Sequence, residues 1–284
     1  MIAEHISIPL TYLLNSSLNS GIFPNIFKIS RVVPIFKKGD PTLPGNYRPI
    51  SITNTISKIF EKIIHRQMIL YFENNNLFND HQFGFTKNRS TAEALICLTE
   101  KIYKNLNDKH SSALILLDFA KAFDSVNHDI LLRKMELMGI KNLELKWFES
   151  YLTNRLQFIK LGEHISDSAQ LKAGVPQGSI LGPLLFTIFT NDFSNSHNSF
   201  SVSFADDTSV LISDKSENTL AEKVRTNLTS IMNWVKANKL TLNIQKTTYI
   251  IISNKRISNN FEVDRKSTRL NSSHRSLSRM PSSA

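Results

Sequence analysis

Apolar side chains follow helical spacing in some stretches and strand-like spacing in others, which predicts a protein of mixed α and β structure. Helical spacing predicts helices over residues 2–20, 53–73, 90–106, 127–139, 143–152, 179–192 and 216–238. Extended runs predict strands at residues 31–36, 111–117, 156–161, 169–173 and 248–253. From residue 111 onward, the order of helices, strands and hairpins predicts an α+β architecture with an antiparallel-rich sheet and helices on one face.

Two alternating runs, 200–204 and 208–212, flank the adjacent carboxylates Asp206 and Asp207. Period-2 alternation on both sides of a short polar break predicts a β-hairpin with these carboxylates at its tip. Neighbouring carboxylates repel each other, so both ionise readily only beside a cation. Taken alone, the stretch is explained equally well by an aspartate-rich surface turn.

A further carboxylate, Asp118, ends the continuously apolar run 111–117. A carboxylate at the end of a buried strand is costly unless it is paired or bound to a metal. If this strand lies beside the hairpin, Asp118, Asp206 and Asp207 meet at one sheet edge. Oxygen ligands without His or Cys suit Mg²⁺, and paired ions of this kind are typical of phosphoryl- or nucleotidyl-transfer sites.

The chain is basic, with a formal net charge of +10 and a pI of about 9.6. Such an excess favours a polyanionic partner, although an ordinary basic protein shows it too. The loop at 78–89 interleaves aromatic and cationic side chains, which can stack on bases or pack onto a core. The densest basic region in the first third comprises Lys28, Arg31, Lys37, Lys38, Arg48, Lys58, Lys62 and Arg66.

The cysteine content and the apolar runs exclude several classes of protein. Cys97 is the only cysteine, so the chain can form neither an internal disulfide nor a cysteine-based zinc site. The N-terminus lacks the layout of a signal peptide, and no uninterrupted apolar run reaches the length of about 18 residues that a membrane span needs. We therefore expect an intracellular protein of the nucleus and cytoplasm, without a membrane partner.

Four segments resemble motifs of reverse transcriptases and occur in the order of that family. Residues 46–51 (Asn-Tyr-Arg-Pro-Ile-Ser) are similar to its fingers motif, and residues 118–124 (Asp-Phe-Ala-Lys-Ala-Phe-Asp) to its first aspartate motif. Residues 174–186, which begin Gly-Val-Pro-Gln-Gly, resemble its middle motif in retrotransposons without long terminal repeats. Residues 204–207 (Phe-Ala-Asp-Asp) resemble its catalytic hairpin. The resemblance implies the RNA-directed DNA polymerase of a LINE-type, jockey-like element.

The resemblance also implies a right-hand polymerase fold. Fingers are expected at residues 1–110 and a palm at 111–255, with a ferredoxin-like antiparallel sheet whose helices lie on one face. The thumb of the family is expected to be missing, as is the endonuclease of the element protein. Residues 256–284 are expected to be a disordered tail, in which 264–284 resemble a translated sequencing adapter and hence an artefact.

For the carboxylates, the resemblance implies metal binding. Asp118, Asp206 and Asp207 would bind two Mg²⁺ ions, with Mn²⁺ as a possible substitute. Phe119, counted among the nucleotide-binding residues, would contribute its carbonyl as a further ligand. Lys246 resembles the lysine that protonates pyrophosphate as it leaves. A lysine at a strand edge explains this residue as well.

For the remaining site residues, the resemblance implies nucleotide binding. Lys37 and Arg48 would bind the triphosphate, and Phe123 would lie under the incoming sugar and exclude a 2′-hydroxyl. Gln177 and Gly178 would place a loop against the nucleotide and the template. A core aromatic is the alternative explanation of Phe123.

The implied partners are an RNA template, a DNA primer and deoxynucleoside triphosphates. A nucleotide cyclase on a similar palm is a competing explanation, but it leaves the loop at 176–178 and the basic first third without a role. A non-enzymatic alternative is a truncated, inactive element relic that at most binds RNA.

Overall fold

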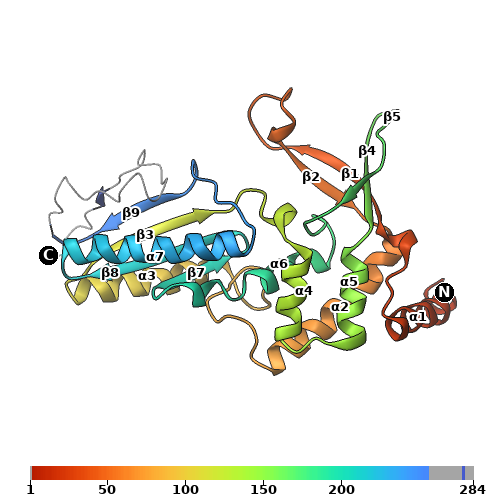
Figure 1. Cartoon of the computed structure of the whole chain (residues 1–284), viewed down its shortest axis with the longest axis horizontal. Coiled ribbons are helices and arrows are strands. Elements are labelled where there is room, and N and C mark those ends of the chain that lie inside the picture. Colours follow the sequence, from red (N-terminus) through yellow and green to blue (C-terminus); the bar gives the residue numbers. More distant parts are fainter. Residues whose placement is uncertain (1, 256–276, 279–284) are drawn as a thin grey trace. The chain divides into compact units, whose positions relative to one another are not determined.

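The computed structural model describes residues 2–255 and 277–278 of the 284-residue chain (Figure 1). The tail expected to be disordered, including the segment at 264–284, lies outside the described residues except for Leu277 and Ser278. None of the described helices is long and apolar enough to cross a bilayer.

The chain folds into two compact units that interleave along the sequence. The first unit comprises Met1–Leu77 and Phe123–Phe189, and the second comprises Phe78–Ala122 and Thr190–Ala284. Each unit therefore takes one stretch from the first half of the chain and one from the second. The linear boundaries expected for fingers and palm stay a prediction.

The first unit combines helices with a mixed sheet (Figure 1). Its helices are α1 (Ile2–Ser20), α2 (Thr55–Asn74), α4 (His128–Leu137), α5 (Asn142–Leu152) and α6 (Leu181–Thr190). Its strands are β1 (Ile29–Phe36), β2 (Tyr47–Ile52), β4 (Arg155–Leu161), β5 (His164–Ile165) and β6 (Ala169–Leu171). The sheet has the order β2-β1-β4-β5, and β6 also pairs with β4. β1 is antiparallel to β2 and parallel to β4.

An aromatic cluster joins α1 and α5 in the core of the first unit. Trp147 stacks on Tyr151 with ring centroids 5.7 Å apart, and Phe23 meets both rings edge-on. The indole Nε1–H of Trp147 donates a hydrogen bond of 2.9 Å to Ser17 Oγ on α1. The buried indole is thus satisfied within the core, as a polar group in an apolar setting requires.

The second unit is built on a sheet with the strand order β10-β9-β3-β8-β7. Its strands are β3 (Ser111–Asp118), β7 (Phe200–Phe204), β8 (Asp207–Asp214), β9 (Thr248–Ile252) and β10 (Leu277–Ser278), and its helices are α3 (Thr91–Asn107) and α7 (Glu217–Ala237). β3 is antiparallel to both β8 and β9, and β7 and β8 form the expected hairpin. Among the described strands of this sheet, only β10 runs parallel to its neighbour, β9. The antiparallel strands β9, β3, β8 and β7, together with the helices, confirm the predicted α+β class.

The helices of the second unit cover both faces of its sheet, whereas one face was expected. α3 packs in one core cluster with Leu114 of β3, Leu211 of β8 and Ile252 of β9. Side chains alternate along a strand, so Ile115 and Val210 point to the opposite face, where α7 contacts β3 and β8 (Figure 1). β3 is buried along most of its length because both of its faces are covered.

Short 3₁₀ turns link several of these elements, at Asn25–Lys28, Pro44–Asn46, Ala122–Ser125 and Phe193–Ser196. The strands β2, β5 and β10 were not predicted, and β10 falls in the tail that was expected to be disordered. All three are edge strands. β2 contains Pro49, a residue that usually argues against a strand, and β5 has only two residues.

Candidate functional site

The three aspartates singled out in the sequence lie at one end of the second unit's sheet. Asp118 ends β3 and stands directly opposite Asp207, the first residue of β8. Asp207 also pairs with Phe204 of β7, so Ala205 and Asp206 form the two-residue turn of the hairpin. The register therefore brings together carboxylates that are far apart in the chain.

The hairpin turn has an unusual backbone. Ala205 has a φ of +57°, in the left-handed region that residues with a Cβ adopt infrequently. Two-residue hairpin turns need positive φ values because these match the twist of the flanking strands. Asp206 follows this residue directly, so its position depends on a locally strained backbone.

Electrostatic repulsion at this edge is visible in Asp207. Burial raises the pKa of the Asp207 carboxyl, and the nearby Asp206 and Asp118 carboxylates raise that pKa further. The Lys246 ammonium acts in the opposite direction and lowers it. Negative charge thus accumulates here beyond what the surroundings neutralise, and a bound cation would relieve it.

Lys246 lies beside Asp118. Its Nζ is 3.5 Å from Asp118 Oδ2, and about half of its side chain is exposed. The backbone of Asp118 is held by the same segment, because Asn243 N–H donates to the Asp118 carbonyl at 2.7 Å and Asp118 N–H donates to Thr247 Oγ1 at 3.4 Å. The sequence placed Lys246 just before a strand, and the fold brings it to the first aspartate.

The donor set at this edge fits a hard divalent cation. Carboxylate oxygens, without nitrogen or sulfur ligands, suit Mg²⁺ or Mn²⁺. Within residues 2–255 and 277–278, however, no three His, Cys, Asp or Glu side chains are already arranged as a metal cage. Two features therefore suit a bound cation at this edge: the carboxylate oxygens as ligands, and the unneutralised negative charge around Asp207.

Phe119 follows Asp118, and its side chain belongs to the core. The ring is buried and lies 6.5 Å from the Phe193 ring and 6.4 Å from the Trp234 ring, between centroids. Its backbone forms a bridge with Leu242. This packing fixes the chain just after Asp118, and the side chain itself is a structural anchor.

The loop at 174–178 belongs to the first unit and is fastened to the end of β2. Ser51 N–H donates to the Gln177 carbonyl at 2.7 Å. Gly178 has a φ of +113°, and a Cβ there would lie 2.5 Å from the Ser51 carbonyl oxygen. The Gln177 Nε2 donates to Asp124 Oδ1 at 3.1 Å. Only glycine fits at 178, because of both its backbone conformation and its neighbour.

Phe123 stacks on a core aromatic of the first unit. Its ring centroid is 4.6 Å from that of Phe186 on α6, with the planes 26° apart. Its carbonyl accepts a hydrogen bond of 2.9 Å from Val175 N–H in the same loop as Gln177. Phe123 is half-buried, so one face of its ring packs in the core of the first unit, whether or not the residue also contacts a nucleotide.

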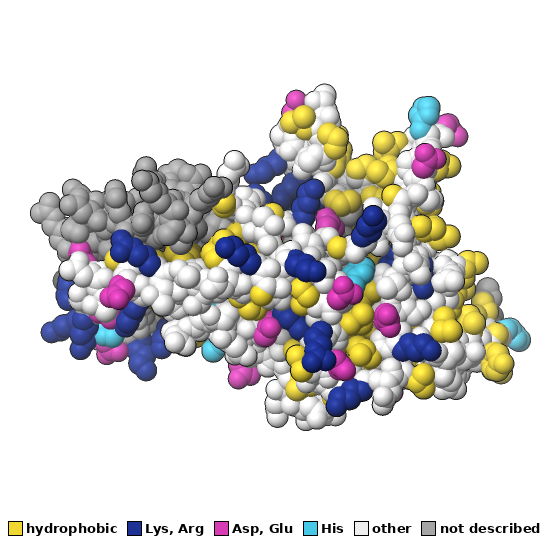
Figure 2. Space-filling model, in the orientation of Figure 1, with side chains coloured by type: hydrophobic (Ala, Val, Ile, Leu, Met, Phe, Trp, Pro, Cys, Tyr) yellow, Lys and Arg dark blue, Asp and Glu magenta, His cyan; other side chains and the backbone are white. Residues whose placement is uncertain are grey.

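Lys37 and Arg48 lie at one end of the β1–β2 pair. Lys37 directly follows β1, and its N–H donates to the Asn46 carbonyl at 2.9 Å. Arg48 is the second residue of β2 and pairs with Ile35. Both cationic side chains are exposed. On the face shown in Figure 2, lysines and arginines are dispersed among acidic side chains, so net charge alone does not mark a binding surface.

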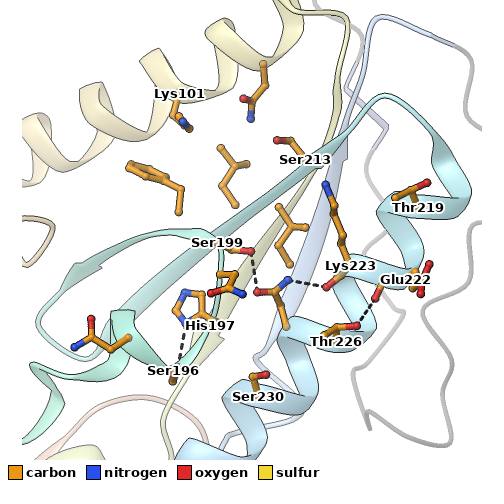
Figure 3. Close-up of a pocket in the computed structure, with 17 residues that line it drawn as sticks. Lys101, Ser196, His197, Ser199, Ser213, Thr219, Glu222, Lys223, Thr226 and Ser230 are labelled. Carbon is orange, nitrogen blue, oxygen red and sulfur yellow. Dashed lines mark hydrogen bonds between the residues drawn. The ribbon is translucent and has the colours of Figure 1, made fainter.

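A pocket of about 670 Å³ lies in the second unit, away from the aspartates (Figure 3). Leu211, Ile212 and Ser213 line it from β8, at the opposite end of the strand from Asp207. Lys101 of α3 and Lys223 of α7 lie on its sides. No sequence pattern predicts this pocket, because its residues come from separate segments and form no motif.

Comparison with known proteins identifies the protein family to which a chain with this fold and these aspartates belongs. Residues 35–270 match the family described as reverse transcriptase (RNA-dependent DNA polymerase). The chain belongs to this family, whose members use divalent metal ions.

Relatives from non-LTR retrotransposons confirm the resemblance seen in the motifs. The chain is 32% identical, over 84% of its length, to the probable RNA-directed DNA polymerase from transposon BS of Drosophila melanogaster. It is 28% identical, over 87% of its length, to the RNA-directed DNA polymerase from the mobile element jockey of the same species. It spans 27% and 28% of the length of these relatives.

Solved structures show the same fold. A structure of apo telomerase from Candida tropicalis, truncated from its C-terminal domain, aligns with a TM-score of 0.58 and 16% identity, covering 84% of this chain and 52% of that one. Telomerase of the same species in complex with the TWJ fragment of telomeric RNA aligns with a TM-score of 0.57 and 16% identity, covering 79% and 41%. These likenesses confirm the polymerase fingers and palm fold.

Proposed function

We propose that this chain is the fingers and palm of an RNA-directed DNA polymerase that adds a deoxynucleotide to a primer 3′-hydroxyl on an RNA template. The observation that carries the proposal is the register of the second unit's sheet. It sets Asp118 opposite Asp207, with Asp206 at the adjoining turn, in a chain of the reverse transcriptase family. The same three positions match the family's aspartate motifs.

In this proposal Asp118, Asp206 and Asp207 bind two Mg²⁺ ions, which Mn²⁺ can replace. Bound ions of this kind lower the pKa of an attacking hydroxyl and neutralise charge on the reacting phosphates. Lys246 donates a proton from Nζ to the leaving pyrophosphate. The 3.5 Å contact between Lys246 and Asp118 supports this role, because it puts a cationic donor at the same edge as the carboxylates.

The proposal assigns nucleotide binding to residues of the first unit and to the Phe119 carbonyl. Arg48 and Lys37 bind the triphosphate, which their exposure at one end of β1 and β2 supports. Phe123 supports the sugar and excludes a 2′-hydroxyl with its ring. Gln177 and Gly178 face the nucleotide and template from a loop that is fastened at Ser51.

Lys246→Ala is expected to lower kcat about 100-fold, because proton transfer by a positioned side chain contributes at least that much. The KM for dTTP should change little, since Lys246 contacts Asp118 and belongs to the carboxylate edge. The measurement is steady-state incorporation with dTTP and with β,γ-bridged analogues whose leaving groups differ in acidity. The loss should be smallest with the most acidic leaving group. An equal loss with every analogue would contradict the proton-donor role.

Arg48→Ala is expected to raise the KM for dTTP about tenfold or more, because a hydrogen bond to a charged group contributes about 1.5–3 kcal/mol. The effect on kcat should be smaller. Lys62→Ala is the matched control, since it removes an exposed cation of the same basic region from α2. A KM that rises equally in both variants would indicate a general charge effect and would exclude a specific triphosphate contact.

The test of the proposed activity is incorporation of dTTP on poly(A)–oligo(dT) by the full chain with Mg²⁺. Incorporation that disappears with the metal and with a substituted aspartate supports a polymerase. Template binding without incorporation supports the inactive relic.

A further inference from the structure

A segment that carries no catalytic motif residue lies against the Asp206–Asp207 hairpin. Residues 79–84, here called the hairpin support, run beside β7. Ser203 N–H donates to the His81 carbonyl at 2.9 Å, and Phe83 N–H donates to the Ser203 carbonyl at 2.8 Å. Gln82 and Ser203 form a parallel bridge. The hairpin support thus adds a short strand next to the hairpin.

The hairpin support meets the turn backbone at Gly84. A Cβ at Gly84 would lie 2.0 Å from the Ala205 nitrogen and 2.8 Å from both the Ala205 Cα and the Phe204 carbonyl carbon. Gly84 is not among the glycines with positive φ, so its own conformation does not require glycine. The requirement comes from the close approach of two backbones, immediately before Asp206.

The hairpin support is itself fixed to the second unit. Asn79 N–H donates to Asn191 Oδ1 at 2.9 Å, and the Asn79 Oδ1 accepts from His81 N–H at 2.8 Å. The Phe83 ring is buried in the α3 core cluster, and the Arg89 guanidinium lies 5.0 Å from its centroid. These contacts hold both ends of the hairpin support in place.

The hairpin turn at Ala205 and Asp206 needs a neighbouring segment that holds it in place. Ala205 keeps a positive φ that costs free energy, and strained backbone persists only where the surroundings over-determine it. The Gly84 backbone packs so closely against the Ala205 turn that even a Cβ at Gly84 would overlap with it. In turn, the Gly84 N–H donates to Gln82 Oε1 at 3.0 Å, which fixes the end of the hairpin support.

We propose that Gly84 is a positioning residue, through which the hairpin support holds the Ala205 turn so that Asp206 and Asp207 stay aligned with Asp118. It acts only through the hairpin and contacts no reacting group. The catalytic consequence rests on the proposed polymerase function. The structural consequence, a fixed turn, does not depend on that function.

The test compares Gly84→Ala with Gly45→Ala in the full chain. Gly45 has no atom within 4 Å of an added Cβ and lacks a positive φ, so it is the matched control. Gly84→Ala must push the turn away, and a displacement of about 1 Å at a reacting centre can cost about 100-fold in rate. We expect kcat for dTTP incorporation to fall about 10- to 100-fold, with little change in KM.

Hydrogen exchange supplies a readout that is independent of activity. In Gly84→Ala, the amides at 203–208 should exchange faster, while those of β9 and α7 keep wild-type rates. Gln82→Ala, which removes the acceptor of the Gly84 N–H without adding an atom, should show the same change more weakly. Wild-type exchange and incorporation in Gly84→Ala would overturn the proposal. If Gly84→Ala unfolds globally, wild-type behaviour of Gln82→Ala overturns it instead.

The two proposals fail in different ways. If the wild-type chain does not incorporate dTTP but Gly84→Ala still loosens residues 203–208, the polymerase function is wrong and the positioning role stands. If the wild-type chain incorporates dTTP and Gly84→Ala matches it in rate and exchange, the positioning role is wrong and the polymerase function stands.

Discussion

Asp206→Asn is expected to reduce incorporation of dTTP on poly(A)–oligo(dT) about 1,000-fold or more, to the level of a metal-free reaction. The substitution removes the charge of one proposed metal ligand at the hairpin tip and keeps the size of the side chain. Metal ions supply several kcal/mol of transition-state stabilisation, and each 1.36 kcal/mol corresponds to about tenfold in rate. Initial rates with Mg²⁺ and with Mn²⁺ measure the loss.

The same substitution is expected to stabilise the chain when no metal is present. Burial raises the pKa of Asp207, and repulsion by Asp206 raises it further, so in the folded state the ionised Asp207 is disfavoured. In a chelator, the contribution of Asp207 to the stability of the wild-type fold should therefore fall as the pH rises from below about 4, the ordinary range of an aspartate, through the raised pKa of its carboxyl. Asp206→Asn relieves part of this loss and should melt at a slightly higher temperature than wild type at pH 7.

Asp214→Asn is the matched control for both effects. Asp214 lies at the other end of β8, where its carboxylate is 2.7 Å from Lys223 Nζ. A partly exposed ion pair of this kind, far from the catalytic edge, contributes about 0–1 kcal/mol, so its loss should leave incorporation within about twofold. Added Mg²⁺ should raise the melting temperature of wild type and of Asp214→Asn, but not of Asp206→Asn. Equal incorporation by wild type, Asp206→Asn and Asp214→Asn would contradict the two-metal proposal.

Local pattern was enough to predict the elements that carry the aspartates. Alternation on both sides of Asp206 and Asp207 predicted the β7–β8 hairpin, and the apolar run ending at Asp118 predicted β3. Period-2 side-chain alternation is a property of the strand itself, so it is visible without tertiary contacts. Local pattern does not show that β3 pairs with β8; the register of Asp118 with Asp207 shows that it does.

Features that depend on packing between distant segments were not predictable. Leu114 and Ile115 are both apolar, which indicates burial of β3 but does not say that α3 covers one face and α7 the other. The role of Gly84 depends on the position of the Ala205 nitrogen, about 120 residues further along the chain, and no motif links the two. The interleaving of the two units has the same origin, since each is closed by long-range contacts.

The site residues fall into two groups for the same reason. The first group lies within the second unit, where strand register and one ion pair connect its members: Asp118, Asp206, Asp207 and Lys246. The second group lies within the first unit, where hydrogen bonds and stacking explain the positions of its members: Arg48, Lys37, Phe123 and the Gln177–Gly178 loop. Their joint role in one reaction came from the resemblance of motifs and stays a proposal, which substitutions in the first unit can test.

Gly178→Ala is the sharpest of these substitutions. The added Cβ would lie 2.5 Å from the Ser51 carbonyl oxygen, and the φ of +113° is one that alanine rarely adopts. Backbone strain of this kind costs about 1–3 kcal/mol, before the overlap with Ser51 is counted. The melting temperature of the chain should fall by about 4–8 °C. The hydrogen bond between Ser51 N–H and the Gln177 carbonyl should lengthen or break, because the loop must move away from β2.

If Gln177 and Gly178 face the incoming nucleotide, this displacement should also lower kcat/KM for dTTP about 100-fold at temperatures where the variant is folded. Gly162→Ala is the control that adds backbone strain without displacing the 174–178 loop. Gly162 has a φ of +57° and no atom within 4 Å of an added Cβ. It should lose about 1–2 kcal/mol of stability and keep wild-type incorporation. A Gly178→Ala chain that melts early yet matches Gly162→Ala in kcat/KM would show that the loop supports the fold of the first unit but takes no part in nucleotide binding.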